Sequence, residues 1–231
     1  MVSKEQVMTN STRDRILNRL YKAQRSTRPF VEPERPPTPA EQMADKRLLA
    51  DRFKTLIEAQ GGCLERASGN DGVLKVLADI FNRKGISRAM ASTDRVISSL
   101  DLPGWAKQTG FSITTQKNYE DRTAFKRAVF TEVDAGITGA AFGFAESGTI
   151  CLMAGGDMPR LTSLAPIIHI AVLPSNQLIP AYEQMAEAVF GETPPSQLIL
   201  ITGPSMTGDI QATPFKGMHG PRELIVILRD D

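Results

Sequence analysis

Glycine is concentrated among hydroxyl and ionisable side chains in three segments of this chain, residues 136–149, 202–209 and 217–223. Glycine permits backbone conformations with positive φ and lets a ligand approach the main chain closely. Loops of this kind at the strand ends of an open α/β sheet can form the walls of a binding site. Plain tight turns have a similar composition, so each segment taken alone is open to both interpretations.

Glu146 follows the apolar run 140–145, where burial of a carboxylate is costly without a charge partner or hydrogen-bond donors. In a structural role, its carboxylate would accept hydrogen bonds from backbone amides of the glycine-rich loops and hold them in register. In a catalytic role, it would act as a covalent nucleophile, as carboxylates do in several enzyme classes. The sequence leaves both roles open.

The two histidines occupy different surroundings. His219 precedes Gly220 in a loop, where an imidazole can donate to a carboxylate or carry a proton as a catalyst, or simply be a hydrogen-bonded turn residue. His169 lies between Ile168 and Ile170 in an apparent strand, which favours a satisfied histidine in the core or at a strand end. The two are far apart in sequence and lack a ligand spacing, so we predict no metal site.

The remaining candidate ligand-binding residues are glycines, hydroxyl-bearing side chains and charged side chains in or near the same segments. They are Thr138, Gly139, Ser147, Gly148, Thr149, Arg160, Gly203, Ser205, Thr207, Asp209 and Gly220. Hydroxyls and backbone amides after the strand expected at 198–202 can hold a phosphate or carboxylate. The same side chains also cap turns with no ligand present. Arg160 can bind a carboxylate bidentately, although an arginine at the surface is the default.

Charge and hydropathy exclude several classes of protein. Lys and Arg total 27 against 26 Asp and Glu, so the chain offers no broad basic surface for nucleic acid or an anionic membrane. No apolar run approaches the roughly 20 residues that span a bilayer, and residues 1–15 lack the hydrophobic stretch of a signal peptide. We therefore expect a cytoplasmic protein without a membrane span.

Cys63 and Cys151 are the two cysteines of the chain, and they show neither CxxC spacing nor clustering. An iron–sulfur cluster or a structural zinc requires a larger set of thiolates, so we expect this chain to hold neither. Both cysteines lie among apolar neighbours, which favours the role of a small buried hydrophobe.

Two parts of the chain differ in composition. Apolar residues at helical spacing predict a short amphipathic helix over 12–24, which either docks a partner or caps the domain. Five prolines between residues 28 and 39 forbid a regular helix and favour an extended linker. We predict an N-terminal helix and proline-rich linker over 1–40, followed by a single α/β domain over 41–231.

The predicted domain alternates short apolar segments with helical ones, a pattern typical of a mostly parallel sheet flanked by helices. A helical stripe over 43–57 stops at the glycine pair 61–62, and further helices are expected at 71–84 and 178–190. Strands are expected at 62–66, 87–92, 149–153, 167–173, 198–202 and 224–228. The last four of these segments are continuous apolar runs, which are typical of strands buried on both faces.

Four motifs in order, GITGAAFGFAESGT, PIIHIAVLP, LITGPSMTGDI and GMHGPRELIVIL, resemble the lactate-utilisation protein C family, whose common unit is the LUD domain. The resemblance covers residues 43–231. It implies a fold like that of ribose-5-phosphate isomerase, glucosamine-6-phosphate deaminase and the CoA transferases. Two positions depart from the family pattern: Met206 stands where a basic residue is usual, which weakens any anion clamp there, and Gly208 stands where alanine is common. Ser147 replaces a threonine and keeps the hydroxyl.

The resemblance also implies a biological setting. The family accompanies two iron–sulfur proteins that together oxidise L-lactate to pyruvate, so the clusters would reside in the partners and this chain would need no cofactor of its own. It would then be an accessory or ligand-binding subunit that takes a small anionic ligand. The alternative is an independent enzyme acting on acyl-CoA or a phosphorylated metabolite, since Ala145-Glu146-Ser147-Gly148 is similar to the nucleophile loop of CoA transferases.

Overall fold

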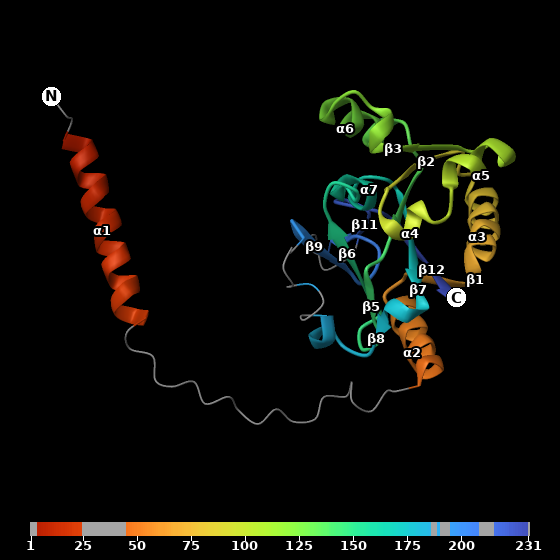
Figure 1. Ribbon diagram of the computed structural model, residues 1–231, viewed down its shortest axis with the longest axis horizontal. Coiled ribbons are helices and arrows are strands. Elements are labelled where there is room, and N and C mark those ends of the chain that lie inside the picture. The colour runs from red at the N-terminus through yellow and green to blue at the C-terminus, as the bar shows by residue number, and fades with distance from the viewer. Residues whose placement is uncertain (1–3, 25–44, 186–188, 190–194, 208–214, 231) are drawn as a thin grey trace. The chain divides into compact units, whose positions relative to one another are not determined.

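The computed structural model, drawn in Figure 1, describes residues 4–24, 45–185, 189, 195–207 and 215–230. The chain divides into two compact units, residues 1–37 and 38–231. The segment predicted as a proline-rich linker, residues 28–39, lies outside the described ranges.

The first unit contains one helix, α1 (Lys4–Gln24), among its described residues. It confirms the helix predicted over 12–24 and extends it by two turns toward the N-terminus. Ile16, Leu20 and Tyr21 are exposed on this helix at spacings that bring them to one side. Within the described ranges, no helix of the protein is long and apolar enough to cross a membrane.

A six-stranded, all-parallel sheet forms the centre of the second unit (Figure 1). Its strands, in spatial order, are β1 (Cys63–Ser68), β12 (Glu223–Asp230), β7 (Ile168–Pro174), β4 (Ala135–Gly139), β2 (Arg88–Ala91) and β3 (Ser112–Thr115). Every residue of β7 is buried, as expected for a strand covered on both faces. The predicted α/β class, with a mostly parallel sheet flanked by helices, is confirmed.

Helices cover the sheet and connect its strands. They are α2 (Lys46–Ala59), α3 (Gly69–Lys84), α4 (Arg95–Ser98), α5 (Leu102–Thr109), α6 (Arg122–Thr131) and α7 (Arg160–Leu164). The carboxylate of Asp45 caps α2 by accepting from Arg47 N, and the chain leaves that helix through Gly61 at φ 84°. Gly85, at φ 67°, ends α3 in the same left-handed conformation. Both helix ends fall where the sequence predicts them.

Alternate residues of the central strands build two separate cores. On one face, Ile170 and Ile225 pack with Leu77 and Phe81 of α3. On the other face, Ala171 and Val226 belong to a cluster that includes Phe53 of α2. The period-2 alternation of a strand therefore divides the apolar side chains between the two helical layers.

A second sheet of four strands lies against the α2 face of the central sheet. The sequence did not predict this separate sheet. Its spatial order is β8 (Leu178–Ile179), β5 (Phe142–Phe144), β6 (Thr149–Ala154) and β9 (Gln197–Ile201). The strands predicted at 149–153 and 198–202 are confirmed as strands, but they pair antiparallel here instead of joining the parallel sheet. Burial of β9 on both faces was a wrong prediction, because β9 is an edge strand and Leu200 is 47% exposed.

The helix predicted over 178–190 is wrong for residues 178–185. Leu178 belongs to strand β8 and pairs with Gly143 of β5, and residues 182–185 form a single 3₁₀ turn, η4. Pro180 explains the difference, since proline disfavours helical backbone at the residue before it. Residues 186–188 and 190 lie outside the described ranges.

Candidate functional site

Two glycine-rich loops meet at the amino ends of β7 and β12. In these loops β10 (Met206–Thr207) pairs antiparallel with β11 (Phe215–Lys216). Beside this pairing, Ser205 N donates to Pro221 O and Gly217 N donates to Ser205 O, each at 2.8 Å. The hydrogen bonds hold together two segments that the sequence singled out separately.

A pocket of about 210 Å³ lies between these loops, the amino ends of β7 and β12, and the carboxyl end of β9. Its lining residues are Ser163, Leu164, His169, Leu200, Ile201, Thr202, Gly203, Ser205, His219, Gly220, Pro221 and Leu224. We call it the two-histidine pocket. Four of the predicted site residues line it together, namely Gly203, Ser205, His219 and Gly220. Open α/β sheets usually bind ligands at the carboxyl ends of their strands, whereas this pocket sits at the amino ends of β7 and β12.

His169 forms the buried inner wall of the two-histidine pocket, with 1% of its surface exposed. Its Nε2 lies 2.9 Å from Thr138 Oγ1 on the neighbouring strand β4. Burial lowers the pKa of His169 to about 4, so the ring is neutral near neutral pH. Nδ1 is also buried and has no hydrogen-bond partner among the described residues. The predicted buried position of His169 is confirmed, but the ring is only half satisfied.

His219 lines the same pocket where it opens to solvent. Its side chain is exposed, and it lines both the two-histidine pocket and an adjoining pocket of about 390 Å³. The fold thus brings the two histidines to one cavity although 50 residues separate them in the sequence. Gly217, at φ 77°, precedes His219 in the turn, and a side chain at that glycine would overlap Arg222.

A chain of hydroxyl groups runs from the β5–β6 turn to the two-histidine pocket. Ser147 Oγ donates to Thr149 Oγ1 at 2.8 Å, and Thr149 Oγ1 lies 3.0 Å from Thr202 Oγ1. Thr202 lines the pocket, whereas Ser147 and Thr149 do not. Two predicted ligand-binding residues are therefore connected to the pocket through a third hydroxyl.

Glu146 lies in the β5–β6 turn and is partly buried. Its Oε1 accepts from Tyr182 N at 2.8 Å, at the start of η4, and its own backbone N donates to Pro180 O at 3.0 Å. Glu146 does not line any of the five pockets described for this structure. The carboxylate joins the turn to the segment that follows β8, and its donor is the amide of Tyr182 rather than an amide of the glycine-rich loops expected from the sequence.

Gly148 fixes the position of the same turn. Its φ is 68°, and a Cβ at this position would overlap backbone atoms of Ile57 and Leu56 in α2. Only glycine permits both the left-handed conformation and so close an approach. Gly148 therefore has a structural explanation that requires no ligand.

Thr138 and Gly139 are also occupied by contacts within the protein. The Thr138 hydroxyl is bonded to His169, and Gly139 N donates to Asp94 Oδ2 at 2.9 Å at the carboxyl end of β4. The other carboxylate oxygen of Asp94 accepts from Val96 N and Ile97 N and so caps α4. Sequence reasoning did not identify Asp94, because an aspartate after a strand is an ordinary helix cap.

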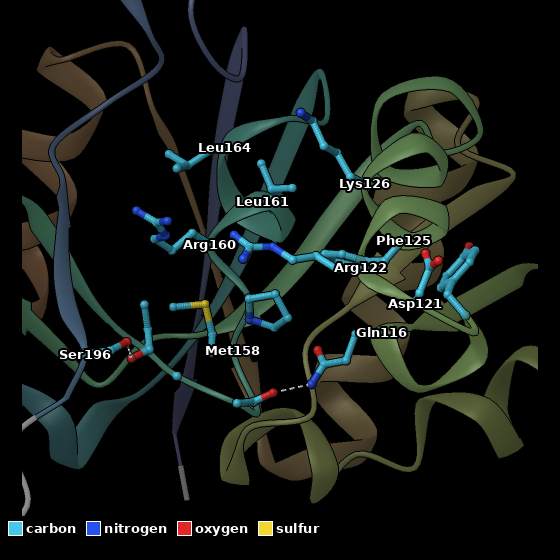
Figure 2. Close-up of a pocket in the computed structure, with 15 residues that line it drawn as sticks. Gln116, Asp121, Arg122, Phe125, Lys126, Met158, Arg160, Leu161, Leu164 and Ser196 are labelled. Carbon is cyan, nitrogen blue, oxygen red and sulfur yellow. Dashed lines mark hydrogen bonds between the residues drawn. The ribbon is translucent and has the colours of Figure 1, made fainter.

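Arg160 is the first residue of α7 and lines a different, larger pocket (Figure 2). Its Nη1 donates to Gln197 Oε1 at 2.7 Å. Leu164, at the other end of α7, lines this pocket, the two-histidine pocket and the adjoining pocket of His219. The five-residue helix thus separates Arg160 from the other candidates while forming a wall common to all three cavities.

Of the two remaining predicted residues, the structure describes only Thr207. Thr207 belongs to β10, pairs with Phe215 and does not line the two-histidine pocket. Asp209 lies outside the described residues.

Neither cysteine has an environment suited to reactivity. Burial raises the pKa of Cys151 to about 11, and burial together with Glu65 raises the pKa of Cys63. The thiolate is the reactive form, so a raised pKa makes each thiol less reactive than an unperturbed cysteine. Across the described part of the chain, no three His, Cys, Asp or Glu side chains come close enough to hold a metal ion.

Comparisons with known proteins agree with this architecture. Residues 50–228 match the family model of the LUD domain. The lactate utilization protein C of Halalkalibacterium halodurans is 35% identical over 130 residues, 53% of this chain and 56% of that protein. The match thus spans about half the length of this relative.

A longer match is to the lactate utilization protein C of Exiguobacterium sp., which is 30% identical over 80% of this chain and 76% of that protein. Among solved structures, a DUF162 family protein from Deinococcus radiodurans has a TM-score of 0.59 at 22% identity, over 81% of this chain and 99% of that one. At this identity the structural likeness concerns the fold alone. From the family model and the longer sequence match together, the chain belongs to the LUD domain family.

Proposed function

We propose that this chain is a ligand-binding subunit of an L-lactate utilisation system, which oxidises L-lactate to pyruvate together with iron–sulfur partner proteins. The relatives named lactate utilization protein C support the setting. The observation that carries the ligand-binding role is the convergence of two histidines and the glycine-rich loops on one pocket.

The dimensions and lining of the two-histidine pocket favour a small hydroxy acid or keto acid. Its volume of about 210 Å³ is below the roughly 300–1,000 Å³ of pockets for drug-sized ligands. Among the described residues, the backbone amides of Gly203 and Gly220 have no hydrogen-bond partner, so both are available to a carboxylate. His169 Nδ1 is buried without a hydrogen-bond partner at the inner wall of this pocket, which leaves one ring nitrogen unsatisfied beside the proposed site.

The surface around His219 is suited to a protein partner. Phe130, Ile167 and Met218 are each more than half exposed, and together with Leu164 they line the pocket of about 390 Å³ that adjoins the two-histidine pocket. We call these four residues the docking face. Exposed apolar side chains gathered in one place mark interaction surfaces. A partner seated here would cover His219, the outer wall of the proposed ligand site.

The partner that we propose for the docking face is an iron–sulfur protein. Lactate oxidation to pyruvate releases two electrons, which an electron carrier must accept. Cys63 and Cys151, the two cysteines of this chain, are too few for the four thiolates that ordinarily ligate a cluster. Apolar contact beside the ligand pocket would bring such a carrier close to the bound substrate.

The experiment is affinity capture of the tagged full-length chain from its source cells grown on lactate, with the eluate assayed for lactate-dependent dye reduction. Wild-type protein should recover iron–sulfur proteins and activity. In the variant Ile167→Glu/Met218→Glu, both the recovery of iron–sulfur proteins and the lactate-dependent activity should fall about tenfold or more. The reason is that two charges placed in an apolar interface are costly to desolvate. Leu48→Glu is the matched control, since Leu48 is 58% exposed on α2 and away from this face.

Two results would overturn the proposal. The first is recovery of the wild-type chain alone under mild conditions. The second is equal lactate oxidation by the isolated partners when this chain is left out.

A further inference from the structure

The largest of the described pockets, about 680 Å³, lies between α6, α7 and the segment that joins β6 to α7 (Figure 2). We call it the α6–α7 pocket. It is about three times as large as the two-histidine pocket and falls within the roughly 300–1,000 Å³ typical of organic ligands and cofactors. The proposed role in lactate utilisation makes no use of it.

Three cationic side chains face this pocket, although the chain as a whole carries a net charge of only +1. Arg122 and Lys126 are one turn apart on α6, and Arg160 stands at the start of α7. In Figure 2 the Arg122 side chain extends from α6 toward the side of the pocket that carries Arg160. The lining includes a single carboxylate, Asp121, which caps α6 by accepting from Ala124 N at 2.7 Å.

The positive charge of these side chains is not neutralised within the described structure. Neither Arg122 nor Lys126 has an ion pair or a side-chain hydrogen bond with any described residue. Arg160 uses one donor, on the neutral amide of Gln197, out of the five that a guanidinium possesses. Arginine forks match the oxygen geometry of phosphate, so this arrangement favours an anion with several oxygens.

Most of the remaining lining is apolar and includes an aromatic pair, and Gln116 and Ser196 are its other polar residues. Phe125 and Met158 are buried in the pocket wall. Tyr119 meets Phe125 edge to face, with ring centroids 6.1 Å apart. A bare inorganic ion would leave this wall in contact with water, whereas the flat body of an organic ligand would cover it.

The glycine pair in the wall of the pocket supports an occupant. Gly155 and Gly156 have no positive φ, and a Cβ added at either would meet no described atom within 4 Å. Neither backbone conformation nor internal packing therefore explains two consecutive glycines at this point. Bare backbone beside an open cavity is what close approach of a ligand requires.

We propose that the α6–α7 pocket binds an organic phosphate with an aromatic body, as in a nucleotide. The phosphate lies among Arg122, Lys126 and Arg160, and the aromatic body lies against Phe125 and Met158. The assignment does not depend on lactate utilisation.

The test is calorimetric titration of the purified full-length chain with ADP, phenyl phosphate and inorganic phosphate. ADP and phenyl phosphate should bind at submillimolar concentration, and inorganic phosphate more weakly. Arg122→Ala/Lys126→Ala should weaken ADP binding by about tenfold or more. The matched control is Lys117→Ala/Arg127→Ala, which removes two exposed cations from the same region outside the pocket and should leave the affinity within about twofold.

Each of three results would overturn the assignment. ADP and phenyl phosphate could both fail to bind at millimolar concentration. The two double variants could weaken binding equally, which would indicate non-specific attraction. Inorganic phosphate could bind as tightly as phenyl phosphate, which would exclude a role for the apolar wall.

Discussion

Thr138 Oγ1 and His169 Nε2 lie 2.9 Å apart on adjacent strands in the interior of the central sheet. Among the described residues, Thr138 is the one hydrogen-bond partner of the buried His169 ring, because Nδ1 has none. Replacement by Thr138→Val should therefore lower the free energy of unfolding by about 1–3 kcal/mol, because both ring nitrogens would be left unsatisfied. Urea denaturation measures the change.

The control for this prediction is Thr138→Ser, which keeps the hydroxyl and should cost less than Thr138→Val. A double-mutant cycle with His169→Gln isolates the interaction between the two side chains. Additive effects in that cycle would mean that the bond contributes nothing to stability.

His169 also predicts how stability changes with pH. Burial lowers its pKa from the ordinary 6.5 to about 4, so between these values the unfolded chain binds a proton that the folded chain does not. Stability contributed by neutral His169 is complete above about pH 6.5 and is lost as the pH falls toward 4, by a total of roughly 3 kcal/mol. The measurement is the free energy of unfolding of wild type and of His169→Gln over this pH range. Subtracting one from the other removes the contribution of the carboxylates, because both proteins contain them. A difference that stays constant with pH would contradict it.

His219 is exposed, so its replacement separates function from folding. We expect His219→Asn to change the free energy of unfolding by no more than about 0.5 kcal/mol. The lactate-dependent activity of the captured assembly should fall by about 100-fold if the imidazole transfers a proton. Full activity in a folded His219→Asn protein would exclude His219 from the chemistry.

Glu146 offers a direct test of the two roles considered from its sequence context. Because Oε1 accepts from Tyr182 N, Glu146→Ala should destabilise the protein by about 1 kcal/mol, and Glu146→Gln should cost less because it keeps an acceptor oxygen. If Glu146 were a covalent nucleophile, Glu146→Gln would abolish activity, because the amide side chain is not nucleophilic. Incubation with acyl-CoA and hydroxylamine would then inactivate the wild type but not Glu146→Gln, and that result would support the catalytic role.

Two glycines should respond in opposite ways to the same substitution. Gly148→Ala forces a side chain into a left-handed conformation and against Leu56 of α2, so we expect a loss of more than about 2 kcal/mol. Gly155→Ala meets open space without positive φ and should be neutral within about 0.5 kcal/mol. Thermal or urea unfolding of the pair measures the contrast. Equal losses would show that the β5–β6 turn does not require the close contact of Gly148 with α2.

Much of the fold follows from local signals in the sequence. The ends of α2 and α3 are marked by Gly61 and Gly85, and the runs at 167–173 and 224–228 are continuous apolar strands. The strands at 149–153 and 198–202 have the same composition yet belong to a second sheet. Which neighbour a strand pairs with depends on tertiary packing that hydrophobic pattern does not encode.

The candidate site was predictable in its loops but not in its inner wall. Gly203, Ser205 and His219 stand out because glycine and polar residues interrupt apolar segments. His169 gave no such signal, since a histidine between two isoleucines has the pattern of any buried strand residue. Its proximity to His219 arises from the order of strands in space, which places the start of β7 beside the loop that precedes β12.

The position of α7 has a consequence for communication between the cavities. Arg160 and Leu164 stand at the two ends of α7. Both line the α6–α7 pocket, and Leu164 also lines the two-histidine pocket and the pocket that adjoins it. Because α7 has only five residues, we expect a ligand that displaces Arg160 to displace Leu164 as well, and Leu164 lines the two-histidine pocket. Thermodynamic linkage is reciprocal. An anion that moves α7 would change the affinity of a second ligand in the two-histidine pocket by some factor, and that second ligand would change the affinity of the anion by the same factor. The concentration of one metabolite would then change the affinity of the protein for another.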